Sequence, residues 1–254
     1  MDVIFNNLSG AAPALLAGTI TTIVAALLAG ILAMLFGIPA GFGRLSRVPL
    51  IRSISTFYVE TIRGTPLLLQ LFVWFYAVKI LLLTIFNLNV DTFAYSLLTD
   101  INSNSIFPRD TGISPYFFAI FGLGFNYGAY IAEVIRGGIE AVEHGQIEAA
   151  QTLGLGSFQI ARLIILPQAL RIMIPPLTNN FITLVQDTAF LEVLGIAELS
   201  LVALQKAQAV GSNVTLRWSF YITDLLIYFV ICYSLALISR HMERRVAVTV
   251  SGAH

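Results

Sequence analysis

Residues 14–42 read ALLAGTITTIVAALLAGILAMLFGIPAGF, a run that contains no charged side chain. A helix needs about 20 mostly apolar residues to cross the hydrocarbon core of a bilayer, so this run is long enough to span a membrane. It is also too long for the apolar part of a cleaved signal peptide. The preceding MDVIFNNLSG lacks the positive head of such a signal. The stretch therefore predicts a retained membrane helix.

The composition of the whole chain agrees with this prediction. The 254 residues are 57% hydrophobic and only 11% charged, with a mean hydropathy of +0.84. Soluble domains usually carry about 25% charged residues, so this chain cannot cover a water-facing surface and is expected to lie in a lipid bilayer. The formal net charge is zero, which indicates no nucleic-acid partner. The single cysteine, Cys232, lies in an apolar run and excludes a disulfide framework.

Four further apolar runs have the length of membrane helices. They lie near 53–84, 115–138, 171–196 and 217–240. The run at 53–84 is long enough to begin as an interfacial segment before it enters the bilayer. Together with 14–42, these runs predict an all-α, polytopic membrane protein with about five transmembrane helices in a single domain, residues 1–254.

Arginine clusters predict the orientation of the chain. One cluster follows the first span and another follows the fifth: Arg44, Arg47 and Arg52, then Arg240, Arg244 and Arg245. Such clusters usually remain on the cytoplasmic side. An odd number of spans then places the N-terminus outside and the C-terminus in the cytoplasm. The segment 85–114, which carries three aspartates and one arginine, would be external, and the polar segment 139–170 would be cytoplasmic.

The chain lacks the motifs that carry catalysis. A nucleotide-binding P-loop needs Gly-Lys-Ser/Thr, and neither of the two lysines, Lys79 and Lys206, follows a glycine. No HExxH, CxxC or GxSxG motif is present, and the three histidines are far apart in the sequence. We therefore expect no enzymatic activity, no metal site and no cofactor in this chain, which disfavours a membrane-embedded enzyme.

Four motifs occur in the order found in one family of transport proteins. They are Glu60-Thr-Ile-Arg-Gly-Thr-Pro-Leu-Leu-Leu-Gln70, Tyr130-Ile-Ala-Glu-Val-Ile-Arg-Gly-Gly138, Gly145-Gln-Ile-Glu-Ala-Ala150 with Gly154 and Pro167, and Asp187-Thr-Ala189. In this order they resemble the membrane (permease) subunits of ABC importers, in the branch for polar amino acid uptake. The resemblance covers about residues 14–245 and implies the type I ABC importer transmembrane fold in a bacterial plasma (inner) membrane.

The resemblance assigns a role to the segment 139–170, the EAA loop. In this family two short helices form a knob that docks in a groove of the ATPase subunit. We expect the helices to meet at the Gly-Leu-Gly-Ser turn 154–157, Ser157 to cap the second helix, and Pro167 to end it. The expected coupling residues are Gly145, Gln146, Glu148, Ala149, Ala150, Gly154 and Pro167.

The resemblance also implies a set of partners. Two ATP-binding cassette ATPase subunits would bind the ATP and Mg²⁺. A second permease subunit, identical or homologous, would complete the pathway within the bilayer, and an extracytoplasmic amino-acid-binding protein or domain would deliver the substrate. An ion-gradient-driven secondary transporter is the alternative, and it leaves the EAA loop unexplained.

The fourth span carries a polar stripe. At 100° per residue, its polar side chains share an arc of about 120°, which cannot face lipid. The stripe is either a structural hydrogen-bonded seam or the lining of the substrate path, and the resemblance favours the lining. The expected path residues are Asn179, Asn180, Thr183, Leu184, Gln186 and Asp187. Some relatives that carry cationic amino acids have an acid at the position of Asn180, so the neutral Asn180 argues against strict arginine or lysine specificity.

Two pairs of opposite charges lie near the cytoplasmic ends of spans. Glu60 and Arg63, like Glu133 and Arg136, are three residues apart and so share a helix face. Each pair either neutralises itself to lower its insertion cost or serves as a gate or structural clamp beside the path. Pro175-Pro176 removes two backbone donors at the start of the fourth span and is a candidate hinge.

Overall fold

The computed structural model describes residues 2–87 and 114–251, and every regular element within these ranges is helical. Five of its helices are long and apolar enough to cross a membrane: Asp2–Arg44, Leu67–Ile85, Pro115–Glu140, Ser157–Leu194 and Val214–His241. The predicted all-α fold with five membrane helices is confirmed. The expected external loop, 85–114, lies largely outside the described residues.

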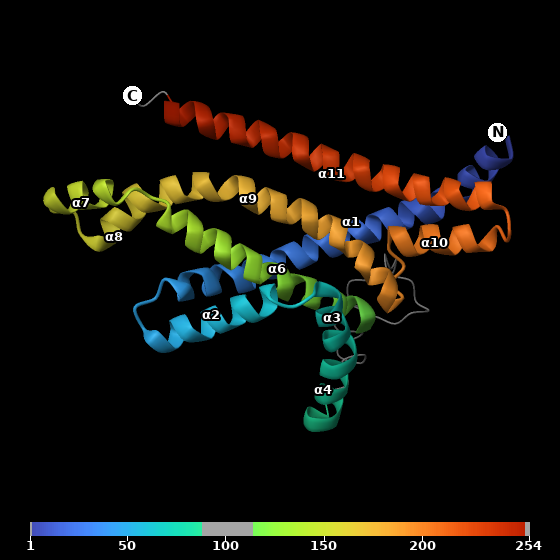
Figure 1. Ribbon diagram of the computed structural model, residues 1–254, viewed down its shortest axis with the longest axis horizontal. Helices are drawn as coiled ribbons and strands as arrows, with labels where there is room; N and C mark the ends of the chain where they lie inside the picture. The colour runs from blue at the N-terminus through green and yellow to red at the C-terminus, as the bar shows by residue number, and fades with distance from the viewer. Residues whose placement is uncertain (1, 88–113, 252–254) are drawn as a thin grey trace, which may run out of the picture. The chain divides into compact units, whose positions relative to one another are not determined.

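Figure 1 shows the order of the helices along the chain. The elements are α1 (Asp2–Arg44), α2 (Pro49–Arg63), α3 (Leu67–Phe72), the π-helical η1 (Val73–Val78), α4 (Lys79–Phe86), α6 (Ser114–Glu140), α7 (His144–Thr152), α8 (Ser157–Ile160), the π-helical η3 (Ala161–Ile165), α9 (Leu166–Asp187), the 3₁₀-helical η4 (Thr188–Leu194), α10 (Leu199–Ala209) and α11 (Val214–Ser251).

The described chain divides into two compact units. Unit 1 comprises Met1–Ile31, Thr65–Gly124 and Thr183–Tyr233, and unit 2 comprises Leu32–Gly64, Phe125–Ile182 and Ser234–His254. The helices α1, α6, α9 and α11 therefore each contribute one part to unit 1 and another to unit 2.

The second predicted span, 53–84, is broken in the structure. The helix α2 ends at Arg63, and the membrane-length helix begins only at Leu67. The break falls at Gly64-Thr65-Pro66, because a proline disfavours helical geometry in the residue before it. The buried Gln70 stabilises the break, since its amide donates to the backbone oxygen of Thr65 at 3.1 Å and to its Oγ1 at 2.7 Å. The interfacial beginning of this run is thus a separate helix.

The fourth predicted span, 171–196, begins earlier than expected. Helical structure runs without interruption from Ser157 to Leu194, so the predicted end at Pro167 is wrong. Pro167 is the second residue of α9, directly after the π-helical segment η3. Wider π-type turns relieve the clash that a proline ring makes with an ordinary α-helical turn. Pro175 and Pro176 likewise lie inside α9.

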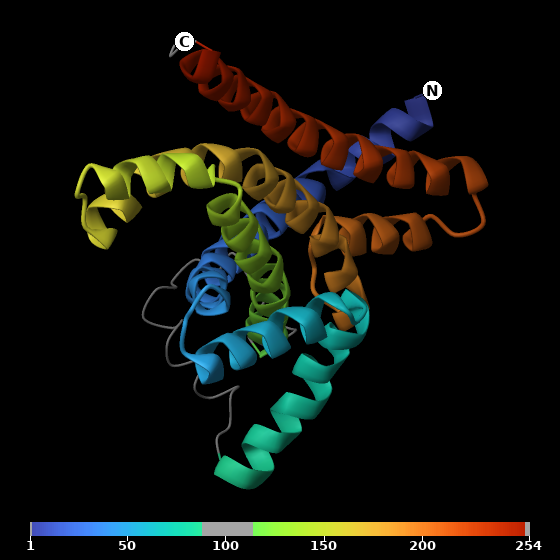
Figure 2. The same ribbon diagram turned by 60° about the vertical axis from the view of Figure 1, so that its left-hand side comes forward.

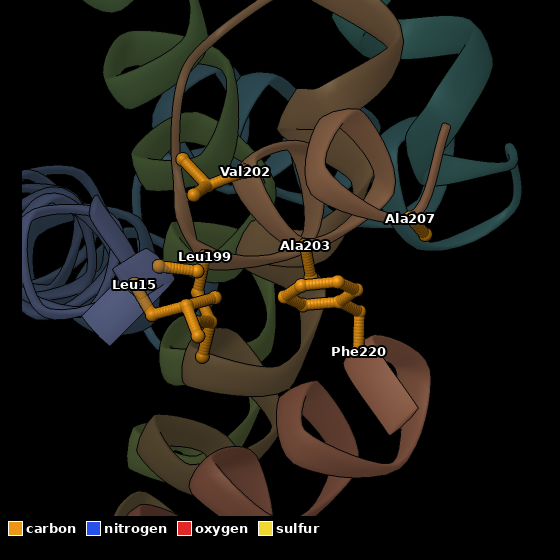
Figure 3. Packing of buried hydrophobic residues seen from close by; sticks show 7 residues of the cluster. Leu15, Leu199, Val202, Ala203, Ala207 and Phe220 are labelled. Atoms are coloured by element: carbon orange, nitrogen blue, oxygen red, sulfur yellow. The ribbon is translucent and has the colours of Figure 1, made fainter. Parts of the chain in front are cut away.

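The core of unit 1 packs the first half of α1 against α10 and the beginning of α11. Figure 3 shows Leu15 of α1 against Leu199 of α10, and Phe220 of α11 beneath Ala203. In this cluster Leu199 and Ala203 are fully buried. The antiparallel pairing of α10 and α11 is visible in Figures 1 and 2, and Arg217 supports it by donating to the backbone oxygen of Ala207 at 3.2 Å.

The core of unit 2 depends on small residues where the second half of α1 meets α6. A Cβ atom added at Gly37 would lie 2.7 Å from the Cβ of Ile131 and 2.8 Å from the backbone oxygen of Gly128. Such close helix–helix contact is typical of membrane proteins, in which small residues allow the backbones to approach. Tyr58 of α2 adds a hydrogen bond to the backbone oxygen of Phe125 at 2.6 Å, and burial raises the pKa of its hydroxyl.

Candidate coupling and translocation sites

The predicted knob is present as a helical hairpin, which Figures 1 and 2 show at the connection of α7 and α8. The helix α7 ends in a Schellman motif: Leu155 donates its backbone N–H to the oxygen of Ala150 at 3.1 Å, and Gly154 donates to Gln151 at 2.9 Å. Gly154 has φ +79°, in the left-handed region. A glycine adopts this conformation without the steric cost of a side chain, so the sharp reversal predicted at 154–157 is confirmed.

The hairpin presents only part of the expected coupling set to its surroundings. Gly145, Glu148 and Ala149 are exposed, whereas Ala150 is 2% exposed. The small side chain of Ala150 therefore serves packing within the chain. Ala150 is therefore not part of the surface that the hairpin exposes.

The second helix of the hairpin is capped differently from the prediction. Gly156 occupies the N-cap position, and its backbone N–H donates to the side-chain oxygen of Gln159 at 3.0 Å. Ser157 is the first residue of α8 and not its cap. The sequence pattern missed Gln159, which lies three residues after the cap, at the position where a Gln or Glu side chain reaches back to the N-cap backbone.

A side-chain contact ties the hairpin to the base of α9. Gln168 donates to the Oε1 of Gln146 across 2.6 Å. Gln168 directly follows Pro167 in the sequence. The hydrogen bond therefore brings the segment that contains Gln146 close to the segment that contains Pro167, and both are predicted coupling residues.

The predicted charge pairs belong to one larger network in unit 2. Glu133 of α6 contacts Arg44 of α1, Arg63 of α2 at 3.7 Å, and Arg136 of its own helix. Glu60 lies 3.6 Å from Arg44. Among the described residues the network comprises three arginines and three glutamates, which balance in formal charge: Arg44, Arg63, Arg136, Glu60, Glu133 and Glu140.

This arrangement corrects the pairing expected from spacing alone. Glu133 and Arg136 do pair, but the ion pairs of Glu60 and Arg63 are made with Arg44 and Glu133 on other helices. The guanidinium of Arg63 also lies 5.4 Å from the ring centre of Tyr130 on α6, a favourable cation–π distance. The network joins α1, α2 and α6, so Glu60 and Arg63 do not form a pair of their own.

The predicted stripe lies on α9, whose residues Asn179, Thr183 and Gln186 are exposed. Asn180 and Asp187 are half-buried. The Nδ2 atom of Asn180 is buried and has no hydrogen-bond partner among the described residues. Leu184 is 2% exposed, so this member of the predicted set packs inside the protein and does not line an open path.

One buried acid was not singled out by the sequence. Glu198 is fully buried in unit 1, where it accepts hydrogen bonds from Tyr228 of α11 at 2.9 Å, Thr22 of α1 at 3.3 Å and the backbone of Leu201 at 2.8 Å. Burial raises the pKa of its carboxyl to about 7, and the nearby Asp224 adds to this effect. The sequence does offer a signal for this residue, because Glu198 is an isolated acid directly before an apolar segment. In the structure that segment forms α10, and Glu198 caps its N-terminus.

Comparison with known proteins places this chain in a family. A family model described as "Binding-protein-dependent transport system inner membrane component" matches residues 33–248. The chain belongs to this family. It is accordingly a multi-pass membrane protein and a permease subunit of an ABC importer, and the ion-driven alternative finds no support in this assignment.

Individual permeases of this family resemble the chain over most of its length. The L-cystine transport system permease protein TcyB of Bacillus subtilis is 35% identical over 92% of this chain and 86% of its own. The glutamine transport system permease protein GlnP of Escherichia coli is 29% identical over 85% and 84%. The nopaline transport system permease protein NocM of Agrobacterium fabrum is 31% identical over 95% and 94%.

Solved structures agree with the predicted type I transmembrane fold of these permeases. A chain of an amino acid ABC transporter, crystallised with histidines, superposes with a TM-score of 0.75 at 29% identity, covering 95% of this chain and 98% of its own. A chain of the inward-facing MetNI methionine ABC transporter superposes with a TM-score of 0.59 at 20% identity, covering 87% and 93%, which supports the fold alone.

Proposed function

We propose that this permease subunit forms half of the path of an ATP-driven importer for polar amino acids. The relatives are named for cystine, glutamine and nopaline, which are all zwitterionic amino acids or amino acid derivatives with polar groups. The exposed amides and hydroxyl on α9 supply hydrogen bonds for such groups, and Asp187 supplies one negative charge toward the α-ammonium group.

The observation that carries the proposed coupling is the hairpin of α7 and α8. Glu148 and Ala149 are exposed on the hairpin. The buried Ala150 and the hydrogen bonds of the Schellman motif stabilise its turn. We expect the hairpin to dock in a groove of a separate ATPase subunit, which binds ATP and Mg²⁺. When the ATPase moves the hairpin, the hydrogen bond from Gln168 to Gln146 transmits that movement to α9, the helix that carries the proposed path residues.

The remaining partners follow from the same proposal. A second permease subunit completes the path, and an extracytoplasmic binding protein delivers the amino acid. The N-terminus lies outside and the C-terminus in the cytoplasm, because the arginines after α1 would then remain on the side of the ATPases. ATP binding closes the ATPase subunits, the hairpins follow, and the path opens outward.

Charge reversal at the hairpin tests the proposal. Glu148→Lys should insert normally but lose most substrate uptake when expressed with its ATPase and binding protein, since a cation replaces the exposed acid at the docking surface. The conservative variant Glu148→Asp keeps the charge and should retain most activity. Wild-type uptake by Glu148→Lys at equal membrane levels would overturn the docking assignment.

A further inference from the structure

The helix α2 exposes an apolar stripe that no other part of the described chain covers. Leu50, Ile54 and Phe57 are 68%, 61% and 73% exposed. At 3.6 residues per turn these three side chains fall within about 60° of one another on the helix surface. The opposite side of the helix carries the buried Val59, so the stripe points away from the core of unit 2.

The connections of α2 restrict what can lie against this stripe. Only residues 45–48 separate it from the end of the membrane helix α1, and only residues 64–66 separate it from the membrane helix that begins at Leu67. A linker of four residues reaches at most about 14 Å, so α2 remains close to the membrane at both ends. Its 15 residues reach about 22 Å, short of the roughly 30 Å hydrocarbon core.

Two cations lie near the stripe but not on it: Arg47 stands in the segment just before α2, and Arg52 lies on the opposite, polar side of the helix. Arg47 and Arg52 are both exposed, and neither forms an ion pair with a described residue. The neighbouring Arg44 is different, because Glu60 and Glu133 neutralise it. A short helix with an exposed apolar face and unpaired arginines is the pattern of an interfacial helix, in which the apolar side chains enter the acyl region and the cations reach the headgroups.

We propose that α2 lies in the membrane interface and binds anionic phospholipid headgroups through Arg47 and Arg52. The apolar stripe favours lipid over water, and the two unpaired cations favour phosphate-bearing, negatively charged headgroups over zwitterionic ones. The site is independent of the substrate path and of the hairpin. It anchors the network of Arg44, Glu60 and Glu133 to the bilayer surface.

The position of α2 is tested by a spin label at Ile54→Cys in a Cys232→Ser background. The full chain is purified with its partner subunits and placed in nanodiscs of phosphatidylcholine and phosphatidylglycerol. The label should collide readily with oxygen and poorly with a water-soluble nickel complex, whereas a label at the exposed Ser212→Cys should show the opposite. Equal nickel accessibility at both sites, or protection of position 54 from both reagents by a protein partner, would overturn the proposal.

The headgroup preference is tested by spin-labelled lipids in the same nanodiscs. The wild-type complex should associate with phosphatidylglycerol more than with phosphatidylcholine. The Arg47→Gln/Arg52→Gln variant should lose this preference by roughly fivefold for each cation removed. The matched Arg47→Lys/Arg52→Lys variant keeps the charge and should keep the preference. An unchanged preference in the glutamine variant would contradict the assignment of these two residues.

Discussion

At the scale of single residues, the proposal that the polar stripe of α9 lines the substrate path makes a prediction about substrate choice. Asp187→Asn should weaken transport of every amino acid if the carboxylate binds the shared α-ammonium group. It should weaken only cationic substrates if it binds a basic side chain. A hydrogen bond to a charged group contributes about 1.5–3 kcal/mol, or roughly 10- to 150-fold in affinity. Asp187→Glu, which keeps the charge, is the control, and competitive uptake of arginine, glutamine and glutamate is the measurement.

The neutral Asn180 supplies a second prediction about specificity. Asn180→Glu places a further acid seven residues before Asp187, roughly 10 Å away along the helix axis, a spacing that suits the two cationic ends of arginine or lysine. We expect the preference in competitive uptake to shift toward these substrates. Unchanged selectivity in this variant and in Asp187→Asn would mean that the stripe is a structural seam.

The buried Glu198 predicts a pH-dependent stability. Its pKa is raised from 4.5 to about 7 in the folded protein, so its stabilising contribution is complete below pH 4.5 and is lost as the pH rises through 7. The loss amounts to about 3 kcal/mol. Thermal melting of the purified protein should therefore show a higher midpoint at pH 5 than at pH 8, and Glu198→Gln should flatten this slope. Identical slopes in the two proteins would refute the prediction.

Residue chemistry could be predicted from the sequence only where the partners are close along the chain. The pair of Glu133 and Arg136 followed from helical spacing. The contact of Glu60 with Arg44 and the burial of Glu198 against Thr22 did not, because these partners lie on different helices. A helical pattern identifies which side chains share a face, but it does not identify what packs against that face.

At the scale of elements, the turn between α7 and α8 can be tested with two glycines that lie two residues apart. Gly154→Ala forces a side chain into a left-handed conformation at φ +79°, which costs about 1–2 kcal/mol. It should weaken the hairpin and reduce the ATPase stimulation by substrate-loaded binding protein, without reducing membrane insertion.

The matched control for this change is Gly156→Ala. Gly156 has φ −72°, and an added Cβ would lie 3.7 Å from the Oε1 of Gln159, an ordinary contact distance. This variant changes only the N-cap of α8 and should lose much less activity than Gly154→Ala in the same ATPase assay. Equal activity of the two alanine variants would show that the geometry of the turn is not required for coupling.

Pro66 and Pro167 had different consequences for their helices, and neither outcome followed from the sequence analysis. Pro66 stops helical structure, because Gly64 and the side chain of Gln70 support the break. Pro167 does not, because η3 widens the helix just before it. The surrounding contacts thus decide whether a proline ends a membrane helix, and these contacts are not visible in the local sequence.

At the scale of the whole molecule, five membrane helices and an orientation were predicted from hydropathy and arginine positions. The number of helices is confirmed, and the orientation stays a prediction. Cysteines placed singly at Gly145 and Ser212, both exposed, in a Cys232→Ser background should label differently in intact cells. The cysteine at 212 should react with an impermeant maleimide, and that at 145 only after permeabilisation. The reverse pattern would invert the orientation.

Transport by the reconstituted complex tests the central claim most directly. The chain is placed in proteoliposomes with its ATPase subunit and binding protein, and uptake of labelled glutamine and arginine is measured with and without ATP. We expect uptake to require ATP and the ATPase subunit and to persist when ionophores collapse the ion gradients. Uptake that proceeds without the ATPase and disappears with an ion gradient would contradict the account.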